Sequence, residues 1–243
     1  MDESAARARL VVEALPGAGN SCRIAGEEAA HARARRLRAG QGVVLVDGSG
    51  REALGRIVRV SRAGVEVFVE EIRRGAAPAH PPIHLLVAAV RPERLSWIAE
   101  KATELGAARV TLVASERTQR FRARDAIAER LARIVREAAK QAEAARWPEV
   151  AGPLPLSEAL RAEEGSATRL ILDPSGEPFP ASLPAEPTAL LVGPEGGWSD
   201  AELDAALGAG WIAVSLAAGK LRAETAAVAA LALARTALAR VAH

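Results

Sequence analysis

The sequence predicts an α/β protein in which a small β-rich domain precedes a larger domain built on a parallel sheet. Two observations support this prediction. An uncharged Gly/Pro/Ala segment, residues 75–82, separates two kinds of pattern, and such a composition is typical of a linker. After it, apolar strand-like runs alternate with helix-like runs, which is typical of a parallel sheet covered by helices. We therefore expect one domain at 1–74 and a second at 83–243.

The first domain consists of short strand-like runs and one basic helix. The helix is predicted over 27–42 and ends near Gly40. The turn sequence at 47–50, Asp-Gly-Ser-Gly, lies between two strand-like runs and indicates a hairpin. Further strand-like runs lie at 9–15 and 64–72. Together these elements predict a small β-rich module.

The second domain shows the alternation of strands and helices. Short apolar runs predict buried strands at 83–90, 109–115, 169–173, 188–193 and 212–217. Runs with an apolar stripe at helical spacing predict helices over 92–107 and 125–146. Ser199 is followed three residues later by Glu202, a capping box that predicts the start of another helix.

Several classes of protein are excluded or disfavoured by the composition. A single cysteine, Cys22, cannot form an internal disulfide and suits a reducing cytosol. The longest apolar run, 226–234, is far shorter than the roughly 20 residues of a membrane span. The N-terminus has acidic residues and no apolar stretch of a signal peptide. We therefore expect a cytoplasmic protein with no membrane partner.

No familiar motif of cofactor, metal or hydrolase chemistry fits its context. The sequence GSGREA at 48–53 matches a loose dinucleotide-binding pattern, but a strand-like run follows it, so it indicates the hairpin turn instead. The four histidines are scattered and no Cys/His cluster exists, so we expect no metal site. Neither a phosphate-binding loop of the nucleotide triphosphatase type nor a serine-hydrolase elbow is present.

Charge is distributed unevenly along the chain. Residues 91–148 carry 13 basic and 8 acidic side chains, whereas residues 149–243 carry 6 and 12. A basic region beside an acidic one indicates a polyanionic partner on one side. Within 116–124, four arginines surround Phe121: Arg117, Arg120, Arg122 and Arg124. This segment is either a solvated loop or, as we favour, a set of contacts to nucleic acid.

Two loops in the second domain are candidates for a ligand site. The segment 190–203, LLVGPEGGWSDAEL, places three glycines and Glu195 between a strand and a helix, where backbone amides can approach a ligand. A second loop, 217–223, follows the next strand. Ligands in α/β folds bind at the carboxyl ends of parallel strands. Arg222 lies within this second loop and Glu224 directly follows it, although Glu224 can also serve only to cap the last helix.

These segments, taken in order, resemble the small-subunit rRNA uridine-N3 methyltransferases (RsmE type) of the SPOUT, or trefoil-knot, superfamily. The similarity extends over most of the chain. It rests on HARARRLRAGQGVVLVDGSG (31–50), WIAEKATELGAARV (97–110), SERT (115–118), IVREAAKQ (134–141), LLVGPEGGWSDAEL (190–203) and SLAAGKLRAETAAVAAL (215–231). The pairing of GPEGG with the later Leu-Arg-x-Glu-Thr-Ala segment is specific.

The resemblance implies a fold, a cofactor and partners. It implies an N-terminal PUA-like β-barrel and a C-terminal SPOUT domain, a parallel sheet with a deep trefoil knot. It implies S-adenosyl-L-methionine as cofactor, small-subunit ribosomal RNA as substrate and an obligate homodimer. It implies that Arg222 stabilises the uracil anion or anchors a phosphate, and that Glu224 orients Arg222 or acts as a base.

The resemblance also implies the remaining site residues. Those expected to shape the cofactor pocket are Leu172, Gly193, Glu195, Gly196, Gly197, Leu216 and Leu221. Those expected to contact RNA are Arg35, Arg36, Arg117, Arg120, Arg122 and Arg124.

Four positions in the cofactor and RNA loops depart from the family pattern. Ala217, Gly219, Lys220 and Ala223 stand where the family usually has Gly, Arg, an aliphatic residue and Thr. Two alternative functions are therefore kept. One is a SPOUT methyltransferase that acts on another RNA atom, such as a ribose 2′-oxygen. The other is a non-catalytic, RNA-binding ribosome-assembly factor.

Overall fold

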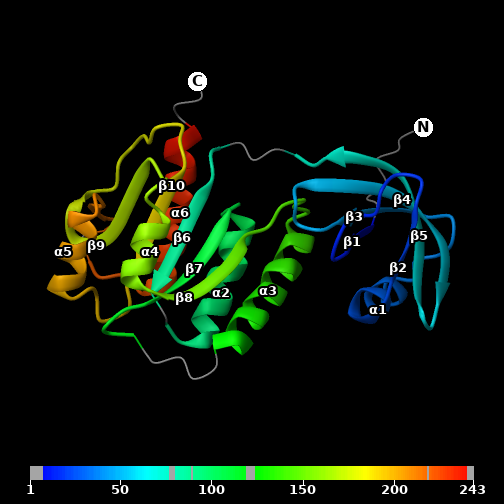
Figure 1. The fold of residues 1–243 in the computed structure, drawn as a ribbon, viewed down its shortest axis with the longest axis horizontal. Coiled ribbons are helices and arrows are strands. Elements are labelled where there is room, and N and C mark those ends of the chain that lie inside the picture. The colour runs from blue at the N-terminus through cyan, green and yellow to red at the C-terminus, as the bar shows by residue number, and fades with distance from the viewer. Residues whose placement is uncertain (1–7, 77–79, 89, 119–123, 218, 240–243) are drawn as a thin grey trace. The chain divides into compact units, whose positions relative to one another are not determined.

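The computed structural model describes residues 8–76, 80–88, 90–118, 124–217 and 219–239 (Figure 1). The chain divides into two compact units. Residues 1–77 and 139–147 form the N-terminal unit, and residues 78–138 and 148–243 form the C-terminal unit. The chain therefore returns to the N-terminal unit after it has left it.

The N-terminal unit is a five-stranded sheet with one helix. Its elements are β1 (Ala8–Val11), β2 (Ser21–Ile24), α1 (Gly26–Ala34), β3 (Gly42–Val46), β4 (Arg51–Ser61) and β5 (Gly64–Arg74). The strand order is β1-β3-β4-β5-β2, with β1 and β3 parallel and the other pairs antiparallel. The hairpin predicted at 47–50 is confirmed, because β3 and β4 pair antiparallel on either side of it.

The core of this unit follows the alternation of its strands. Val65, Val67 and Val69 of β5 are buried, while the intervening residues face outward. The buried side chains of α1, Ala29 and Ala32, pack into the same cluster. The helix is shorter than predicted because Arg36 adopts a left-handed backbone (φ 56°), which ends the helical hydrogen bonding.

Residues 139–147 pack on the β3–β4 hairpin. The Gly50 amide donates to the Ala145 carbonyl (3.0 Å), and the Arg146 guanidinium donates to the Ser49 carbonyl (3.0 Å). A Cβ on Gly48 would lie 2.3 Å from the Trp147 ring, so only glycine permits this approach. The Lys140 side chain forms an ion pair with Glu28 of α1.

The C-terminal unit is a parallel sheet flanked by helices, as predicted. Its elements are β6 (Ile83–Ala88), α2 (Pro92–Glu104), β7 (Arg109–Ala114), α3 (Arg124–Gln141), β8 (Glu149–Pro155), α4 (Leu156–Ala162), β9 (Thr168–Pro178), β10 (Thr188–Val192), α5 (Asp200–Gly208), β11 (Ile212–Ser215) and α6 (Ala223–Ala239). The order is β11-β9-β10-β6-β7-β8, and every neighbouring pair is parallel.

Helices cover this sheet through apolar side chains. All five residues of β10 are buried, as expected for a strand covered on both faces. Helices α4 and α5 contribute Leu160 and Ala206 to a cluster with Leu86 and Leu191. Helix α6 packs against β6, β10 and α2. Its buried residues are mostly alanines at helical spacing, which allows close packing on the sheet.

Candidate functional site

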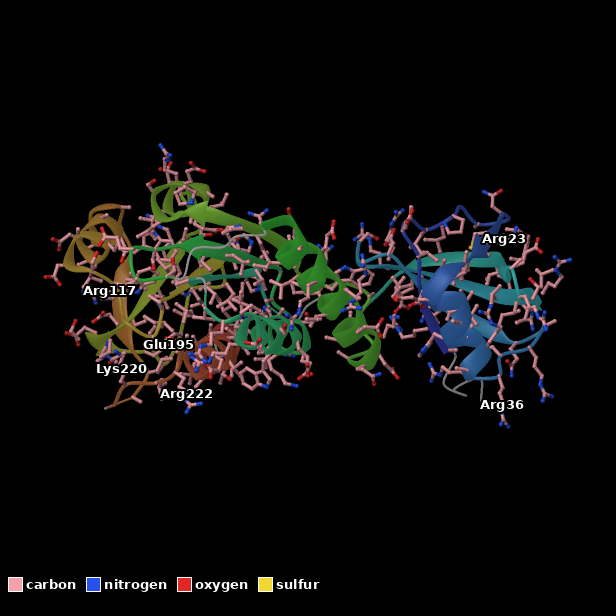
Figure 2. The ribbon with its side chains drawn as sticks, turned by 90° about the horizontal axis from the view of Figure 1, so that it is seen from below. Arg23, Arg36, Arg117, Glu195, Lys220 and Arg222 are labelled. Carbon is pink, nitrogen blue, oxygen red and sulfur yellow. The ribbon has the colours of Figure 1, made fainter. Side chains whose placement is uncertain are left out.

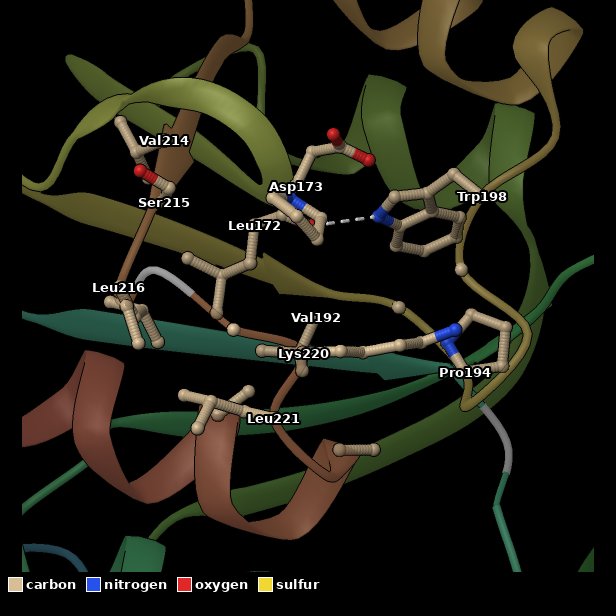
Figure 3. A pocket seen from close by; sticks show the side chains of 17 residues that line it. Leu172, Asp173, Val192, Pro194, Trp198, Val214, Ser215, Leu216, Lys220 and Leu221 are labelled. Carbon is tan, nitrogen blue, oxygen red and sulfur yellow. Dashed lines mark hydrogen bonds between the residues drawn. The ribbon is translucent and has the colours of Figure 1, made fainter.

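A pocket of about 170 Å³ opens at the carboxyl ends of β9, β10 and β11 (Figure 3). Its lining residues come from three chain segments, 172–174, 192–198 and 214–226. The sequence predicted the second and third of these segments as ligand loops. The carboxyl edge of a parallel sheet is where α/β folds bind ligands.

The first segment reaches the pocket because β9 bulges. Ile171 pairs with Ala213 of β11, but the next pair joins Glu177 to Val214, so residues 172–176 have no partner on β11, although Leu172 still pairs with Val192 of β10. A Cβ on Gly176 would lie 2.5 Å from the β11 backbone, so glycine is needed where the strands rejoin. The bulge presents 172–174 to the pocket.

The second segment is the glycine-rich loop after β10. The Trp198 indole is buried, and its Nε1–H donates to the Leu172 carbonyl (3.3 Å), which ties this loop to the β9 bulge (Figure 3). A Cβ on Gly193 would lie 3.0 Å from the Trp198 Nε1 atom, so glycine allows the ring to pack here. Gly197 has φ 72°, a conformation that favours glycine.

Neighbouring elements hold this loop from outside. The Arg117 guanidinium donates to the carbonyls of Gly196 (2.8 Å) and Trp198 (3.1 Å). The predicted capping box is confirmed, because the Glu202 amide donates to the Ser199 hydroxyl and the Ser199 amide donates to the Glu202 carboxylate. The other oxygen of the buried Glu202 carboxylate accepts from the Glu116 amide (2.8 Å). Arg117, which the sequence assigned to RNA, thus contacts the pocket loop.

The third segment leads into α6. Leu216, Lys220 and Leu221 line the pocket. Arg222 is exposed, and its carbonyl accepts from the Ala226 amide (2.9 Å), which begins the helix. Glu224 follows in the first turn and is largely buried, with 17% of its side chain exposed. Figure 2 shows Lys220, Arg222 and Glu195 in the C-terminal unit.

Arg94, at the start of α2, forms ion pairs with one carboxylate of the glycine-rich loop and with one in the first turn of α6. It pairs with Glu195 of the second segment, and its Nε lies 3.6 Å from Oε1 of Glu224. The other Glu224 oxygen, Oε2, is buried and has no hydrogen-bond partner among the described residues. Arg94 was not predicted as a site residue, because nothing local to it indicates pairing with the distant residues Glu195 and Glu224.

The pocket brings together five of the seven residues predicted to bind a cofactor. Those five are Leu172, Gly193, Gly197, Leu216 and Leu221. Glu195 and Gly196 lie on the same loop but are exposed and outside the lining. The role of all seven residues in cofactor binding stays a prediction.

The predicted RNA contacts are dispersed. Arg35 and Arg36 are exposed at the end of α1 in the N-terminal unit. Arg120 and Arg122 lie outside the described residues, as does the side chain of Arg124, the first residue of α3. These roles also stay predictions.

Several lining residues were not predicted from the sequence, among them Asp173, Pro174, Trp198 and Ser215. One signal was available for the first two. The sequence Asp-Pro-Ser-Gly at 173–176 has the composition of a turn directly after an apolar strand. It would have indicated a third strand-end loop.

The described residues contain no group of three His, Cys, Asp or Glu side chains that could hold a metal ion. None of the helices in the described part of the chain is both long and apolar enough to span a membrane.

Comparison with known proteins identifies the family. A model of the RNA methyltransferase domain matches residues 78–235, and a model of the RNA methyltransferase PUA domain matches residues 24–70. The chain belongs to the RNA methyltransferase family. The predicted fold class, a SPOUT methyltransferase domain after a PUA-like domain, is confirmed. The trefoil knot stays a prediction.

Relatives of this RNA methyltransferase are similar to it over most of their length. The ribosomal RNA small subunit methyltransferase E of Mycobacterium tuberculosis is 35% identical over 235 residues, covering 90% of this chain and 88% of the relative. The enzyme of that name from Synechocystis is 31% identical, covering 82% and 67%.

Solved structures agree with this assignment. A ribosomal RNA small subunit methyltransferase E from Neisseria gonorrhoeae, solved bound to S-adenosyl methionine, is 27% identical with a TM-score of 0.84, covering 93% of this chain and 95% of that one. A methyltransferase from Legionella pneumophila, solved with the cofactor SAM, is 28% identical with a TM-score of 0.83, covering 93% and 96%.

Proposed function

We propose that this RNA methyltransferase transfers a methyl group from S-adenosylmethionine to N3 of a uridine in small-subunit ribosomal RNA. The observation that carries the proposal is the pocket built from three strand-end loops and tied together by the Trp198–Leu172 hydrogen bond. The names of the relatives and the cofactor in two of the neighbouring structures support the substrate and the methyl donor.

The residues of the pocket fit this cofactor. Leu172, Leu216 and Leu221 give apolar walls suited to an adenine ring. Gly193 and Gly197 line the pocket and have no side chain of their own, so a ligand can approach their backbone closely. The carboxylate of Asp173 is a hydrogen-bond acceptor suited to hydroxyl groups such as those of a ribose.

Methylation requires that N3 of the uracil lose its proton, so that the ring is an anion when N3 accepts the methyl group. When bound, S-adenosylmethionine supplies a methyl group that is already activated by its sulfonium charge. The exposed Arg222 lies between two lining residues, Leu221 and Ala223, where its guanidinium can stabilise a uracil anion or hold a phosphate. The unpartnered Oε2 of Glu224 can accept a hydrogen bond from an N–H group.

The first test is calorimetry with S-adenosylmethionine, followed by methylation of small-subunit RNA and mass analysis of its nucleosides. We expect binding and the appearance of N3-methyluridine. Methylation at a ribose instead would favour the 2′-oxygen alternative, and absence of binding would favour the assembly-factor alternative.

We expect Arg222→Ala to lower the rate of methylation about 100-fold while folding and cofactor binding stay intact. Turnover near that of the wild type would exclude this role for Arg222.

The N-terminal unit is proposed to hold the RNA. Arg35 and Arg36 are consecutive, exposed arginines at the end of α1, and arginine suits phosphate recognition. Arg36 occupies a left-handed position where glycine is usual. Keeping an arginine there costs about 1 kcal/mol, which supports a functional role for its side chain.

The remaining proposals concern organisation. We propose a cytoplasmic homodimer in which the partner subunit completes the site, and functional domains at 1–74 and 83–243 joined by 75–82. Light scattering of the purified protein tests the dimer.

A further inference from the structure

We infer that Arg94 is a positioning residue, which holds the glycine-rich loop after β10 and the first turn of α6 in the arrangement that binds the cofactor. This inference rests on the proposed function, because it concerns the same pocket. It adds to the site a residue that lies on a third element, α2, and outside the pocket lining.

The geometry gives Arg94 two partners on two different segments. Its guanidinium pairs with Glu195 on one loop and approaches Oε1 of Glu224 to 3.6 Å on the other. Arg94 is the third residue of α2, and α2 packs against α6. Helix α2 therefore holds Arg94 where its side chain contacts both the glycine-rich loop and the first turn of α6.

The guanidinium of Arg94 balances two carboxylates in a partly buried environment. Without Arg94, the carboxylates of Glu195 and Glu224 would both lose the cation that they share, which now offsets their negative charge. The side chains of Arg94 and Glu224 are only 25% and 17% exposed, so salt screens them less than surface groups. Oε2 of Glu224 is already buried without a hydrogen-bond partner among the described residues, and loss of Arg94 would also remove the ion pair of Oε1.

The two carboxylates are adjacent in the chain to residues that line the pocket. Pro194 precedes Glu195, and Ala223 precedes Glu224; both line the pocket. A displacement of either carboxylate therefore moves the pocket wall. Arg94 is expected to affect cofactor affinity more than the stability of the whole chain.

The test compares the full-length wild type with Arg94→Gln, Arg94→Lys and a matched control, Arg91→Gln. Glutamine removes the charge, whereas lysine keeps the charge but loses the two-armed shape. Arg91 is exposed, directly precedes α2, and makes no side-chain cap hydrogen bond. Each protein is titrated with S-adenosylmethionine by calorimetry, and KM, kcat and the melting temperature are measured.

We expect Arg94→Gln to raise Kd and KM for S-adenosylmethionine about tenfold, with kcat at saturating cofactor and the melting temperature close to those of the wild type. Arg94→Lys should recover part of the affinity, and Arg91→Gln should match the wild type. Equal affinity in Arg94→Gln and the wild type would overturn the inference. A wild type that binds no S-adenosylmethionine would overturn the proposed function itself.

A second variant decides the matter if Arg94→Gln does not fold. Glu195 is exposed, so Glu195→Gln leaves the core intact. Weaker cofactor binding by Glu195→Gln supports the inference, provided that adding it to Arg94→Lys weakens binding by less than the product of the two single effects. Unchanged binding by Glu195→Gln overturns it.

Discussion

Lys220 brings a positive charge to a pocket whose other lining residues are mostly apolar. Figure 3 shows its extended side chain reaching across the pocket toward Pro194. The resemblance implies that the family usually has an aliphatic residue at this position, so the charge departs from that pattern. The proposed methyl donor carries a positive sulfonium, whereas the demethylated product, S-adenosylhomocysteine, has a neutral sulfur. Lys220 therefore interacts differently with the two.

We predict that Lys220→Val improves binding of S-adenosylmethionine relative to S-adenosylhomocysteine about two- to fivefold, because two unit charges a few ångströms apart interact by about 1 kcal/mol in water. Calorimetry with both ligands at low ionic strength measures the ratio. Both ligands carry the same amino-acid carboxylate, so any pairing of Lys220 with it cancels in the ratio of the two affinities. Lys220→Arg is the control that keeps the charge. A ratio that does not change would contradict the prediction.

At the scale of elements, the end of α1 combines a structural cost with a proposed function. The Arg36 amide donates to the Arg33 carbonyl (2.8 Å), and the Leu37 amide donates to the Ala32 carbonyl (3.0 Å). This is the hydrogen-bond pattern of a Schellman motif, in which glycine is usual at the left-handed position. Helix termination and RNA contact thus make opposite demands on residue 36.

We predict that Arg36→Gly has opposite effects on stability and on RNA binding. The free energy of unfolding should rise by about 1 kcal/mol, because glycine adopts the left-handed backbone without strain. RNA affinity should fall, and the slope of log affinity against log salt should decrease by about 1. Denaturant unfolding and binding titrations at several salt concentrations measure both effects. Arg36→Lys should keep the salt slope. Unchanged RNA affinity in Arg36→Gly would remove this residue from the interface.

The elements that sequence patterns predicted well are those with strong periodicity. The apolar runs of β6, β7 and β10 and the stripes of α2 and α3 indicated each element correctly. Strand β8 was missed because its sequence, EVAGPLP, contains a glycine and two prolines, which argue against a strand. It lies at the sheet edge, where proline is tolerated.

The candidate site was predictable only in part, because some of its features depend on contacts between segments that are distant in the sequence. Glycines and turn residues at strand ends are local signals, and they indicated Gly193 and Gly197. The β9 bulge depends on its register against β11, a strand that comes later in the sequence. The ion pairs of Arg94 depend on the packing of α2 beside α6. Neither relation is encoded in a short stretch of sequence.

On the scale of the whole molecule, the described part of each unit contains a buried carboxylate whose pKa is lowered, Glu52 in one and Glu163 in the other. Burial alone would raise the pKa of Glu52, but hydrogen bonds from Arg9 (2.6 Å) and Arg73 (3.0 Å) lower it below the ordinary value of about 4.5. Burial likewise opposes the lowering of the pKa of Glu163, which hydrogen bonds with His84 and Ser166 (both 2.8 Å) outweigh. The stability of each unit thus depends on the ionised form of its buried carboxylate.

We predict that acid destabilises both units through these groups. A carboxylate whose pKa is lowered on folding stabilises the protein above its unfolded pKa, and this contribution is lost as pH falls through the folded pKa. Glu52→Gln and Glu163→Gln should each reduce the free energy of unfolding at pH 7 by roughly 1–3 kcal/mol. The deficit should shrink as pH falls below about 4.5. Urea unfolding at pH 7 and pH 3 measures it, and an equal deficit at both values would contradict the prediction.

The return of residues 139–147 to the N-terminal unit has a consequence for biosynthesis. A domain that ended at the linker could fold as soon as it left the ribosome, since domains generally fold as units during synthesis. Here the segment that packs on the β3–β4 hairpin is made only after β6, α2, β7 and most of α3. The nascent N-terminal unit must therefore wait, with the surfaces around Gly48 and Glu28 uncovered, until residue 147 emerges.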